Sequence, residues 1–246
     1  MRAALGVWRL VRVLIHGLHG LAIVLARFPF LPAPARHARI GWWSAKLLRL
    51  MGITLQRVGT PRAGAKLLVA NHVSWLDIAA IHAVLPEARF VSKADVRQWP
   101  LVGRLVAGAG TLFIEREKKR DALRVVHQMA EALKAGDTVA VFPEGTTGDG
   151  RTLLPFHANL LQAAIATEAP IQPIVLRFSD ERHAVSPVAE FLGDTTLASS
   201  LWRFVAARGV GVEVRVLASM ATAHADRRAL AAHVRETIAA QLPRAT

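Results

Sequence analysis

The chain reads LLVANHVSWLD over residues 67–77. Its first four residues form a short, continuous apolar run, which is typical of a strand buried on both faces of a sheet. A helix that starts at Ser74 would place His72 in the turn between this strand and the helix. Such a turn lies at the carboxyl edge of a parallel sheet, where open α/β folds bind their ligands. The stretch therefore predicts an α/β fold and the position of its site.

Short apolar runs alternate with helical patterns from residue 53 to the end of the chain. The predicted strands are 53–57, 67–70, 89–92, 111–114, 138–142, 171–176 and 212–216. The predicted helices are 74–84, 101–107, 118–135, 158–167 and 225–241. This alternation predicts a mainly parallel sheet flanked by helices. The stretch 180–201 shows no clear pattern, and we predict no element there.

Most of the net charge of this 246-residue chain, +13, lies in its N-terminal third, because this part has no acidic residues. Residues 1–76 hold 11 of the 31 Lys and Arg residues and none of the 18 Asp and Glu residues. A basic, apolar segment joined to a nearly neutral remainder predicts an element that binds an anionic membrane surface. Nucleic acid is the competing partner for so basic a protein. We expect no nucleic-acid binding, because the basic region is too apolar for a solvated phosphate-binding face.

The N-terminal region contains two apolar stretches separated by FPFLPAP at residues 28–34. A helix over the uncharged run 13–26 would rise roughly 21 Å, short of the ~30 Å hydrocarbon core of a membrane. We therefore predict a helix–turn–helix that lies in one leaflet, with Trp42 and Trp43 at the level of the headgroups. The alternatives are a helical pair packed on the protein's own core and a cleaved signal peptide. The predicted domains are a membrane-association element over residues 1–52 and an α/β domain over residues 53–246.

Several kinds of chemistry are excluded or disfavoured by residues that the chain lacks. It has no cysteine, which excludes disulfides, thiolate nucleophiles and Cys-ligated zinc. It has no Gly-x-Ser-x-Gly elbow and no glycine motif for nucleotide phosphates, which disfavours serine hydrolases and nucleotide-binding folds. His16 and His19 share a helix face without a nearby carboxylate, so we predict no metal site.

His72 and Asp77 are spaced to form a catalytic pair. A carboxylate in the first turn of a helix is kept ionised by the helix dipole and can hold one imidazole nitrogen. The other nitrogen is then free to take a proton from a substrate. The alternative interpretation is that Asp77 only caps the helix, and that His72 is a hydrogen-bonded turn residue.

Two further motifs follow predicted strands. Residues 110–116 read GTLFIER and end on Arg116, whose planar guanidinium suits a phosphate group. Residues 142–146 read FPEGT, in which Glu144 could bind a hydroxylated head group beside exposed backbone N–H groups. Taken singly, the first could be part of a solvated charge cluster and the second an ordinary turn.

In this order and spacing, the three motifs resemble the glycerolipid acyltransferase family typified by 1-acyl-glycerol-3-phosphate acyltransferases. The His-x4-Asp block is residues 71–77, and Pro173 lies in a looser fourth block. The resemblance covers about residues 65–180 and implies a glycerol-3-phosphate acyltransferase-like fold. It implies transfer of a fatty acyl group from acyl carrier protein or coenzyme A to the hydroxyl of a lysolipid. The expected acceptor is 1-acyl-sn-glycerol-3-phosphate. The product would be phosphatidic acid, made in phospholipid biosynthesis at the cytoplasmic face of the inner membrane, with no bound cofactor.

The resemblance also implies roles for single residues. His72 would be the general base, and Asp77 would orient it. Arg116 would bind the phosphate of the acceptor, and backbone N–H groups near the third motif would stabilise the oxyanion. The full set of implied substrate-binding residues is Arg116, Glu144, Gly145, Thr146, Phe113 and Gly110.

The chain departs from the family pattern directly after Thr146. Many members have Arg and Ser there, whereas this chain continues Thr147-Gly148-Asp149-Gly150-Arg151. The missing cation puts a phosphomonoester acceptor in doubt, although Arg151 or Lys93 could replace it. A lyso-ornithine lipid or another lysolipid is therefore an alternative acceptor. An alternative of a different class is a membrane lipid-binding protein without catalytic activity.

Overall fold

A computed structural model describes residues 2–114 and 119–243 of the chain. Over these residues, seven strands form one sheet in the order β1-β7-β6-β2-β5-β3-β4. Neighbouring strands are parallel except for β6 and β7, which pair antiparallel. The mainly parallel sheet predicted from the sequence is therefore confirmed. The strands are β1 (Thr54–Val58), β2 (Lys66–Ala70), β3 (Ala88–Lys93), β4 (Leu112–Ile114), β5 (Thr138–Val141), β6 (Ile171–Ser179) and β7 (Gly211–Val216).

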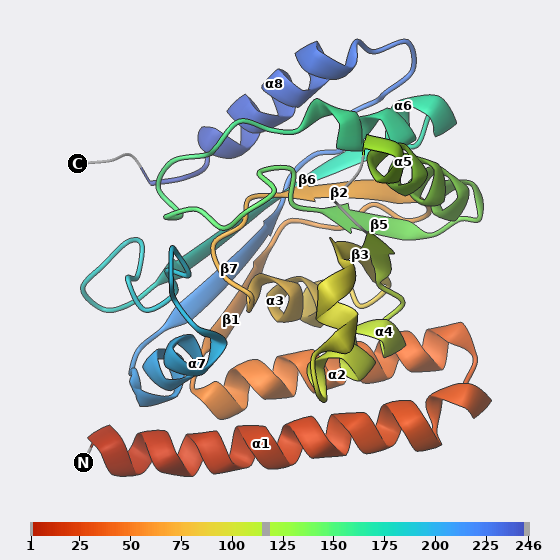
Figure 1. Cartoon of the computed structure of the whole chain (residues 1–246). Coiled ribbons are helices and arrows are strands. Elements are labelled where there is room, and N and C mark those ends of the chain that lie inside the picture. Colours follow the sequence, from red (N-terminus) through yellow and green to blue (C-terminus); the bar gives the residue numbers. More distant parts are fainter. Residues whose placement is uncertain (1, 115–118, 244–246) are drawn as a thin grey trace.

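Helices cover both faces of the sheet (Figure 1). On one face, α5, α6 and α8 enclose a core that includes Met129 and Val234. On the other face, α2, α3 and α7 enclose a second core that includes Ile81 and Phe204, and α1 forms an outer layer beyond them. The helices are α1 (Arg2–Ala26), α2 (Ala33–Met51), α3 (Asp77–Val84), α4 (Val102–Gly108), α5 (Lys119–Lys134), α6 (Gln162–Thr167), α7 (Leu197–Ala206) and α8 (Arg227–Ala239), with 3₁₀ turns at Phe28–Phe30, Ala94–Gln98 and Ala158–Leu161.

The central strands explain the apolar runs of the sequence. Every residue of β2 and β5 is buried, because helices pack on both faces of the sheet. The two strands pair in register, with Val69 beside Val141. Residues 71 and 142, the first beyond these strands, therefore leave the sheet side by side at its carboxyl edge.

The structure differs from the sequence prediction at the start of α3 and at α7. The helix expected from residue 74 begins at Asp77, and residues 74–76 form a turn in which Asp77 N–H donates to the carbonyl of Ser74 at 3.1 Å. Helix α7 lies in the stretch for which no element was predicted. Its start carries a recognisable signal, since the Thr196 hydroxyl accepts the N–H of Ser199 as an N-cap.

The N-terminal helix–turn–helix is confirmed, but α1 is longer than predicted. It begins at Arg2, and its 25 residues correspond to roughly 37 Å of helix. It packs closely on α2, since a Cβ on Gly20 would lie 2.4 Å from Nε1 of Trp43. Trp43 Nε1 donates to the carbonyl of His16, and His16 Nε2 lies 3.0 Å from the carbonyl of Trp43. His16 is thus part of the contact between the two helices.

The helical pair also packs on the rest of the protein, as the alternative interpretation expected. Leu48 and Met51 of α2 are fully buried in the core beneath the sheet. Arg9 of α1 donates to the carbonyl of Ala207 at 2.6 Å, just beyond the end of α7. Helix α2 ends at Met51, and the residue that follows as C-cap, Gly52, has a φ of 79° that suits a glycine. The division of the chain after residue 52 into a membrane-association element and an α/β domain stays a prediction.

Candidate active site

His72 and Asp77 meet at the carboxyl end of β2. His72 lies in the turn after the strand, and Asp77 is the first residue of α3. Nδ1 of His72 lies 2.8 Å from Oδ2 of Asp77. The Asp77 side chain is fully buried, whereas that of His72 is 19% exposed. The imidazole is therefore held from within the protein while part of it stays open to a substrate.

The hydrogen bonds of Asp77 determine which imidazole nitrogen carries the proton. Its Oδ2 also accepts the backbone N–H groups of Val73 and Ser74, at 2.7 and 2.9 Å. An oxygen that accepts two N–H groups is a carboxylate acceptor, so the hydrogen shared with His72 belongs to Nδ1. Nε2 of His72 then has a free lone pair and can take a proton from a hydroxyl. The same oxygen thus forms the dyad and the bond back to Ser74 that the capping alternative expected, but Ser74 lies in the turn before α3 and is not the N-cap of this helix.

The remaining contacts of His72 come from the segment that follows β5. Its ring stacks on Phe142, with centroids 4.0 Å apart and planes inclined by 11°. Its N–H donates to Oε1 of Glu144 at 2.9 Å, and its carbonyl accepts the N–H of Gly148 at 2.7 Å. The first and third sequence motifs are thus joined through His72.

Glu144 contacts the backbone of His72 and is only 5% exposed. Its second oxygen, Oε2, accepts the N–H of Leu154 at 2.9 Å. Burial raises the pKa of Glu144, and the hydrogen bonds from Leu154 and His72 partly oppose this rise. The structure thus brings Glu144 to the backbone of His72, and contact with a head group stays a prediction.

The other predicted site residues lie at different distances from the dyad. Gly145, with φ 75°, makes the turn after β5, and its N–H donates to the carbonyl of Phe142. Thr146 is exposed beside it. Phe113 is on β4 and pairs with Ser92, which places it level with the carboxyl end of β5. Gly110 precedes β4, and its carbonyl accepts Nε of Arg89 near the amino edge of the sheet, so the structure does not bring it to His72.

Arg116 lies outside the residues that the structure describes, as does the side chain of Lys93. The predicted phosphate contact of Arg116 therefore stays a prediction.

Asn71 is a residue that sequence reasoning missed. Its side chain donates to the carbonyl of Leu176 at 2.9 Å and accepts its N–H at 2.8 Å. Asn71 thereby fixes the start of the His72 turn to β6, and its place in the first motif was the available signal.

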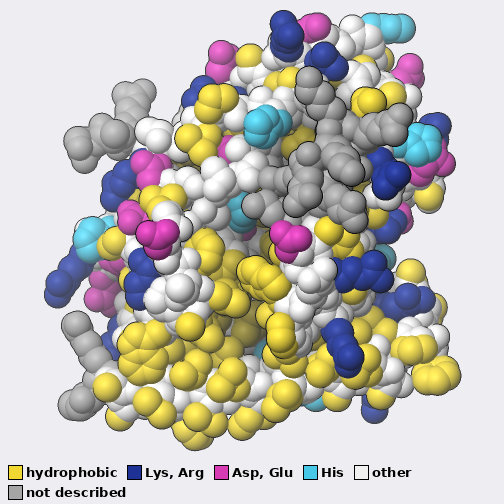
Figure 2. Space-filling view, viewed as in Figure 1, with side chains coloured by type: hydrophobic (Ala, Val, Ile, Leu, Met, Phe, Trp, Pro, Cys, Tyr) yellow, Lys and Arg dark blue, Asp and Glu magenta, His cyan; other side chains and the backbone are white. Residues whose placement is uncertain are grey.

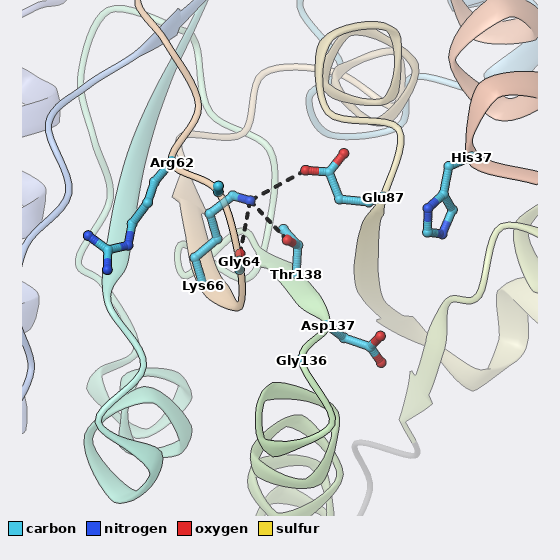
Figure 3. A pocket seen from close by; sticks show the side chains of 9 residues that line it. His37, Arg62, Gly64, Lys66, Glu87, Gly136, Asp137 and Thr138 are labelled. Atoms are coloured by element: carbon cyan, nitrogen blue, oxygen red, sulfur yellow. Dashed lines mark hydrogen bonds and ion pairs between the residues drawn. The ribbon is translucent and has the colours of Figure 1, made fainter. Parts of the chain in front are cut away.

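A polar cavity of about 190 Å³ lies at the opposite edge of the sheet (Figure 3). Lys66 and Thr138, the first residues of β2 and β5, line it together with Arg62, Glu87 and Asp137. The Lys66 ammonium donates to Thr138 Oγ1, to the Gly64 carbonyl and to Glu87. The buried cation is therefore neutralised within the protein. The cavity lies at the amino ends of strands whose carboxyl ends hold the dyad, so it is separate from the active site.

A partly exposed imidazole held by a buried carboxylate at the carboxyl edge of the sheet is an arrangement that can activate a substrate hydroxyl. The Acyltransferase family model matches residues 54–177. The chain is 35% identical over 206 residues to a lyso-ornithine lipid O-acyltransferase of Pseudomonas aeruginosa, covering 83% of this chain and 78% of the relative. It is 36% identical over 191 residues to a 1-acyl-sn-glycerol-3-phosphate acyltransferase of Neisseria gonorrhoeae, covering 77% and 74%.

The crystal structure of the 1-acyl-sn-glycerophosphate (LPA) acyltransferase PlsC from Thermotoga maritima has the same fold. It matches with a TM-score of 0.67 at 20% identity, over 94% of this chain and 95% of that one. The chain belongs to the acyltransferase family, and it is an O-acyltransferase.

Proposed function

We propose that this enzyme transfers a fatty acyl group from acyl carrier protein or coenzyme A to the free hydroxyl of 1-acyl-sn-glycerol-3-phosphate. The product is phosphatidic acid, and the thioester is a co-substrate, so no bound cofactor is needed. The observation that carries this proposal is the His72–Asp77 hydrogen bond, which leaves Nε2 as the proton acceptor of a partly exposed imidazole. Relatives from two Neisseria species, each 36% identical, are named for this reaction.

The chemistry follows from this arrangement. Nε2 of His72 takes the proton of the acceptor hydroxyl as its oxygen attacks the thioester carbonyl. Buried Asp77 stabilises the imidazolium that forms. The tetrahedral intermediate then collapses, the C–S bond breaks, and His72 returns the proton to the departing thiolate. The products are the ester and a free thiol, and His72 is restored.

The developing oxyanion needs N–H donors that are not already used within the protein. The amides of Gly145 and Gly148 donate to Phe142 and His72. We propose the amide of Thr146, in the turn between them, as the oxyanion donor. A Thr146→Pro variant, which lacks this N–H, should lose kcat, and unchanged kcat would exclude the assignment.

A lyso-ornithine lipid is the second candidate acceptor, and Thr147 favours it. This neutral side chain donates to the carbonyl of Phe191 and occupies the position where the family resemblance leads us to expect a cation. Arg151, a possible replacement, donates through Nη2 to the carbonyl of Val185 at 3.4 Å. The relative from Pseudomonas aeruginosa is named for this acceptor.

A panel of acceptors distinguishes these functions. Purified enzyme with an acyl thioester should release free thiol with 1-acyl-sn-glycerol-3-phosphate at a higher kcat/KM than with lyso-ornithine lipid or other lysophospholipids. Protein omitted from the reaction is the control for spontaneous hydrolysis. A higher kcat/KM with lyso-ornithine lipid would assign the alternative acceptor. Vesicle binding without thiol release from any lysolipid would instead support a non-catalytic lipid-binding protein.

We propose that α1 lies in the plane of the inner membrane's cytoplasmic leaflet. One face of α1 packs on α2, α4 and α7, whereas the other is a continuous apolar surface (Figure 2). By length and composition alone, Ala3–Ala26 could also cross a membrane. Packing of its inner face on the domain along its length supports the in-plane orientation. The exposed apolar residues of α1 are Val7, Trp8, Val11, Leu14, Ile15, Leu18 and Leu25.

Leu18→Glu tests this surface. Leu18 is 61% exposed, and burying a leucine in an apolar phase is worth about 1.5–3 kcal/mol, so the variant should bind anionic vesicles at least about tenfold more weakly. The measurement is flotation with vesicles containing phosphatidylglycerol. Leu123→Glu is the matched control, since Leu123 is 74% exposed on α5, on the opposite side of the sheet. Equal loss in both variants would contradict the assignment of α1.

A further inference from the structure

The carboxylate of Glu144 is directed at backbone groups on two different segments. Oε1 accepts the N–H of His72, and Oε2 accepts the N–H of Leu154, both at 2.9 Å. The residue is almost completely buried, so little of the carboxylate can reach a ligand. The sequence interpretation placed a substrate head group on this residue, but both of its oxygens are engaged within the protein.

The loop around Glu144 closes tightly on His72. The N–H of Gly148 donates to the carbonyl of His72 at 2.7 Å, so the residue is held at both its N–H and its C=O. A Cβ on Gly148 would lie 3.4 Å from Oε2 of Glu144 and 3.7 Å from the carbonyl of His72. A single methyl group on Gly148 would thus already be at van der Waals distance from the carboxylate and from the main chain of His72. A head group could not enter between them without moving the loop.

These backbone contacts complete the orientation of the imidazole. Asp77 fixes one ring nitrogen and Phe142 supports one ring face. Neither contact fixes where the Cα of His72 lies relative to the sheet. The hydrogen bonds from residues 144–148 do, because they join this turn to the neighbouring strand.

The segment on the other side of Glu144 is anchored in turn. Arg235 of α8 donates through Nε to the carbonyl of Leu154 at 3.0 Å and through Nη2 to the carbonyl of Leu153. A continuous series of hydrogen bonds therefore runs from α8 through Leu154 and Glu144 to His72. Its members lie far apart in sequence, and the carboxylate is the link between them.

We propose that Glu144 is a positioning residue that holds the general base His72 in place, and that it does not bind the head group of the acceptor. This inference rests on the proposed acyl transfer, since the position of a base matters only to an enzyme that uses it. A displacement of about 1 Å of a catalytic group can cost about 10²-fold in rate. Loss of Glu144 should therefore lower kcat and leave the affinity for the acceptor unchanged.

Glu144→Gln is the test. Glutamine has nearly the same shape but only one acceptor oxygen, so one of the two N–H groups would face an NH₂ group. We expect kcat to fall by about 10- to 100-fold, with acceptor KM within twofold of wild type. The control is Glu131→Gln, which removes the same charge from a side chain 58% exposed on α5.

The outcomes separate the possible roles of Glu144. A raised acceptor KM at unchanged kcat would show that Glu144 binds the head group and would overturn the inference. Wild-type kcat in Glu144→Gln would overturn it as well. Wild-type enzyme that releases no thiol with any lysolipid overturns the proposed function itself, and the inference falls with it.

A second variant covers the case in which Glu144→Gln does not fold. Arg235→Met removes the anchor of the Leu153–Leu154 segment from helix α8, at a partly exposed position far in sequence from the proposed catalytic motifs. We expect a smaller loss of kcat, about threefold to tenfold, with unchanged acceptor KM. Unchanged kcat in folded Arg235→Met, together with a failure of Glu144→Gln to fold, would assign Glu144 a purely structural role and overturn the inference.

Discussion

Replacing His72 by alanine is expected to lower kcat for acyl transfer by about 10³-fold, the middle of the range for removal of a general base. The acceptor hydroxyl would have to lose its proton to water, because Nε2 of His72, which carries the lone pair when Nδ1 donates to Asp77, is removed. The fold should persist, since the imidazole is partly exposed and its neighbours Asp77 and Phe142 remain. The measurement is thiol release under saturating acceptor.

His233→Ala is the control for this prediction, because His233 is an exposed histidine on α8, away from the dyad. It should have wild-type kcat. Retention of full activity by His72→Ala, with both proteins folded, would refute the assignment of the base and with it the proposed mechanism.

Asp77→Asn should show the second large effect, a loss of kcat of about 10²-fold or more together with a lower free energy of unfolding. The asparagine carboxamide is neutral and cannot stabilise an imidazolium as a carboxylate does. If its oxygen takes over the bonds from Val73, Ser74 and His72, its NH₂ group occupies the place of Oδ1. That atom is buried and has no partner within the described part of the chain. An unpaired buried N–H costs about 1–3 kcal/mol.

The two consequences of this substitution are separated by measuring stability by denaturant titration and kcat per folded molecule. A residue that only caps its helix would lower stability and leave kcat unchanged. Asp226→Ala is the control, since Asp226 caps α8 by accepting the N–H groups of Arg228 and Ala229. We expect this variant to be less stable and to have wild-type kcat. If Asp77→Asn behaves like Asp226→Ala, the dyad is not catalytic.

The strands could be predicted from the sequence, because their positions follow from the local pattern of apolar residues. All seven strands appear within a few residues of their predicted bounds. The signal is strongest for β2 and β5, because buried parallel strands have continuous apolar runs. Helix α7 was missed because its short apolar pattern follows a long irregular segment, where the Thr196 cap is the local signal. The length of α1 was underestimated because arginines interrupt its apolar pattern. Arg9 and Arg12 are both compatible with a helix, since Arg9 reaches the carbonyl of Ala207 and exposed Arg12 lies over the ring of Trp8.

The sequence predicted a pairing of His72 with Asp77, because a short strand-to-helix turn keeps the two side chains close, and the observed hydrogen bond agrees with it over the alternative of a cap alone. It also determined the class of fold, through the alternation of buried strands and helices. The tertiary structure determines what holds His72 in place, since Glu144, in the segment after β5, accepts the N–H of His72 and is itself held by the N–H of Leu154. It likewise decided which face of α1 is exposed. Both depend on contacts between residues remote in sequence, which form only when the sheet is assembled and its helices pack against it.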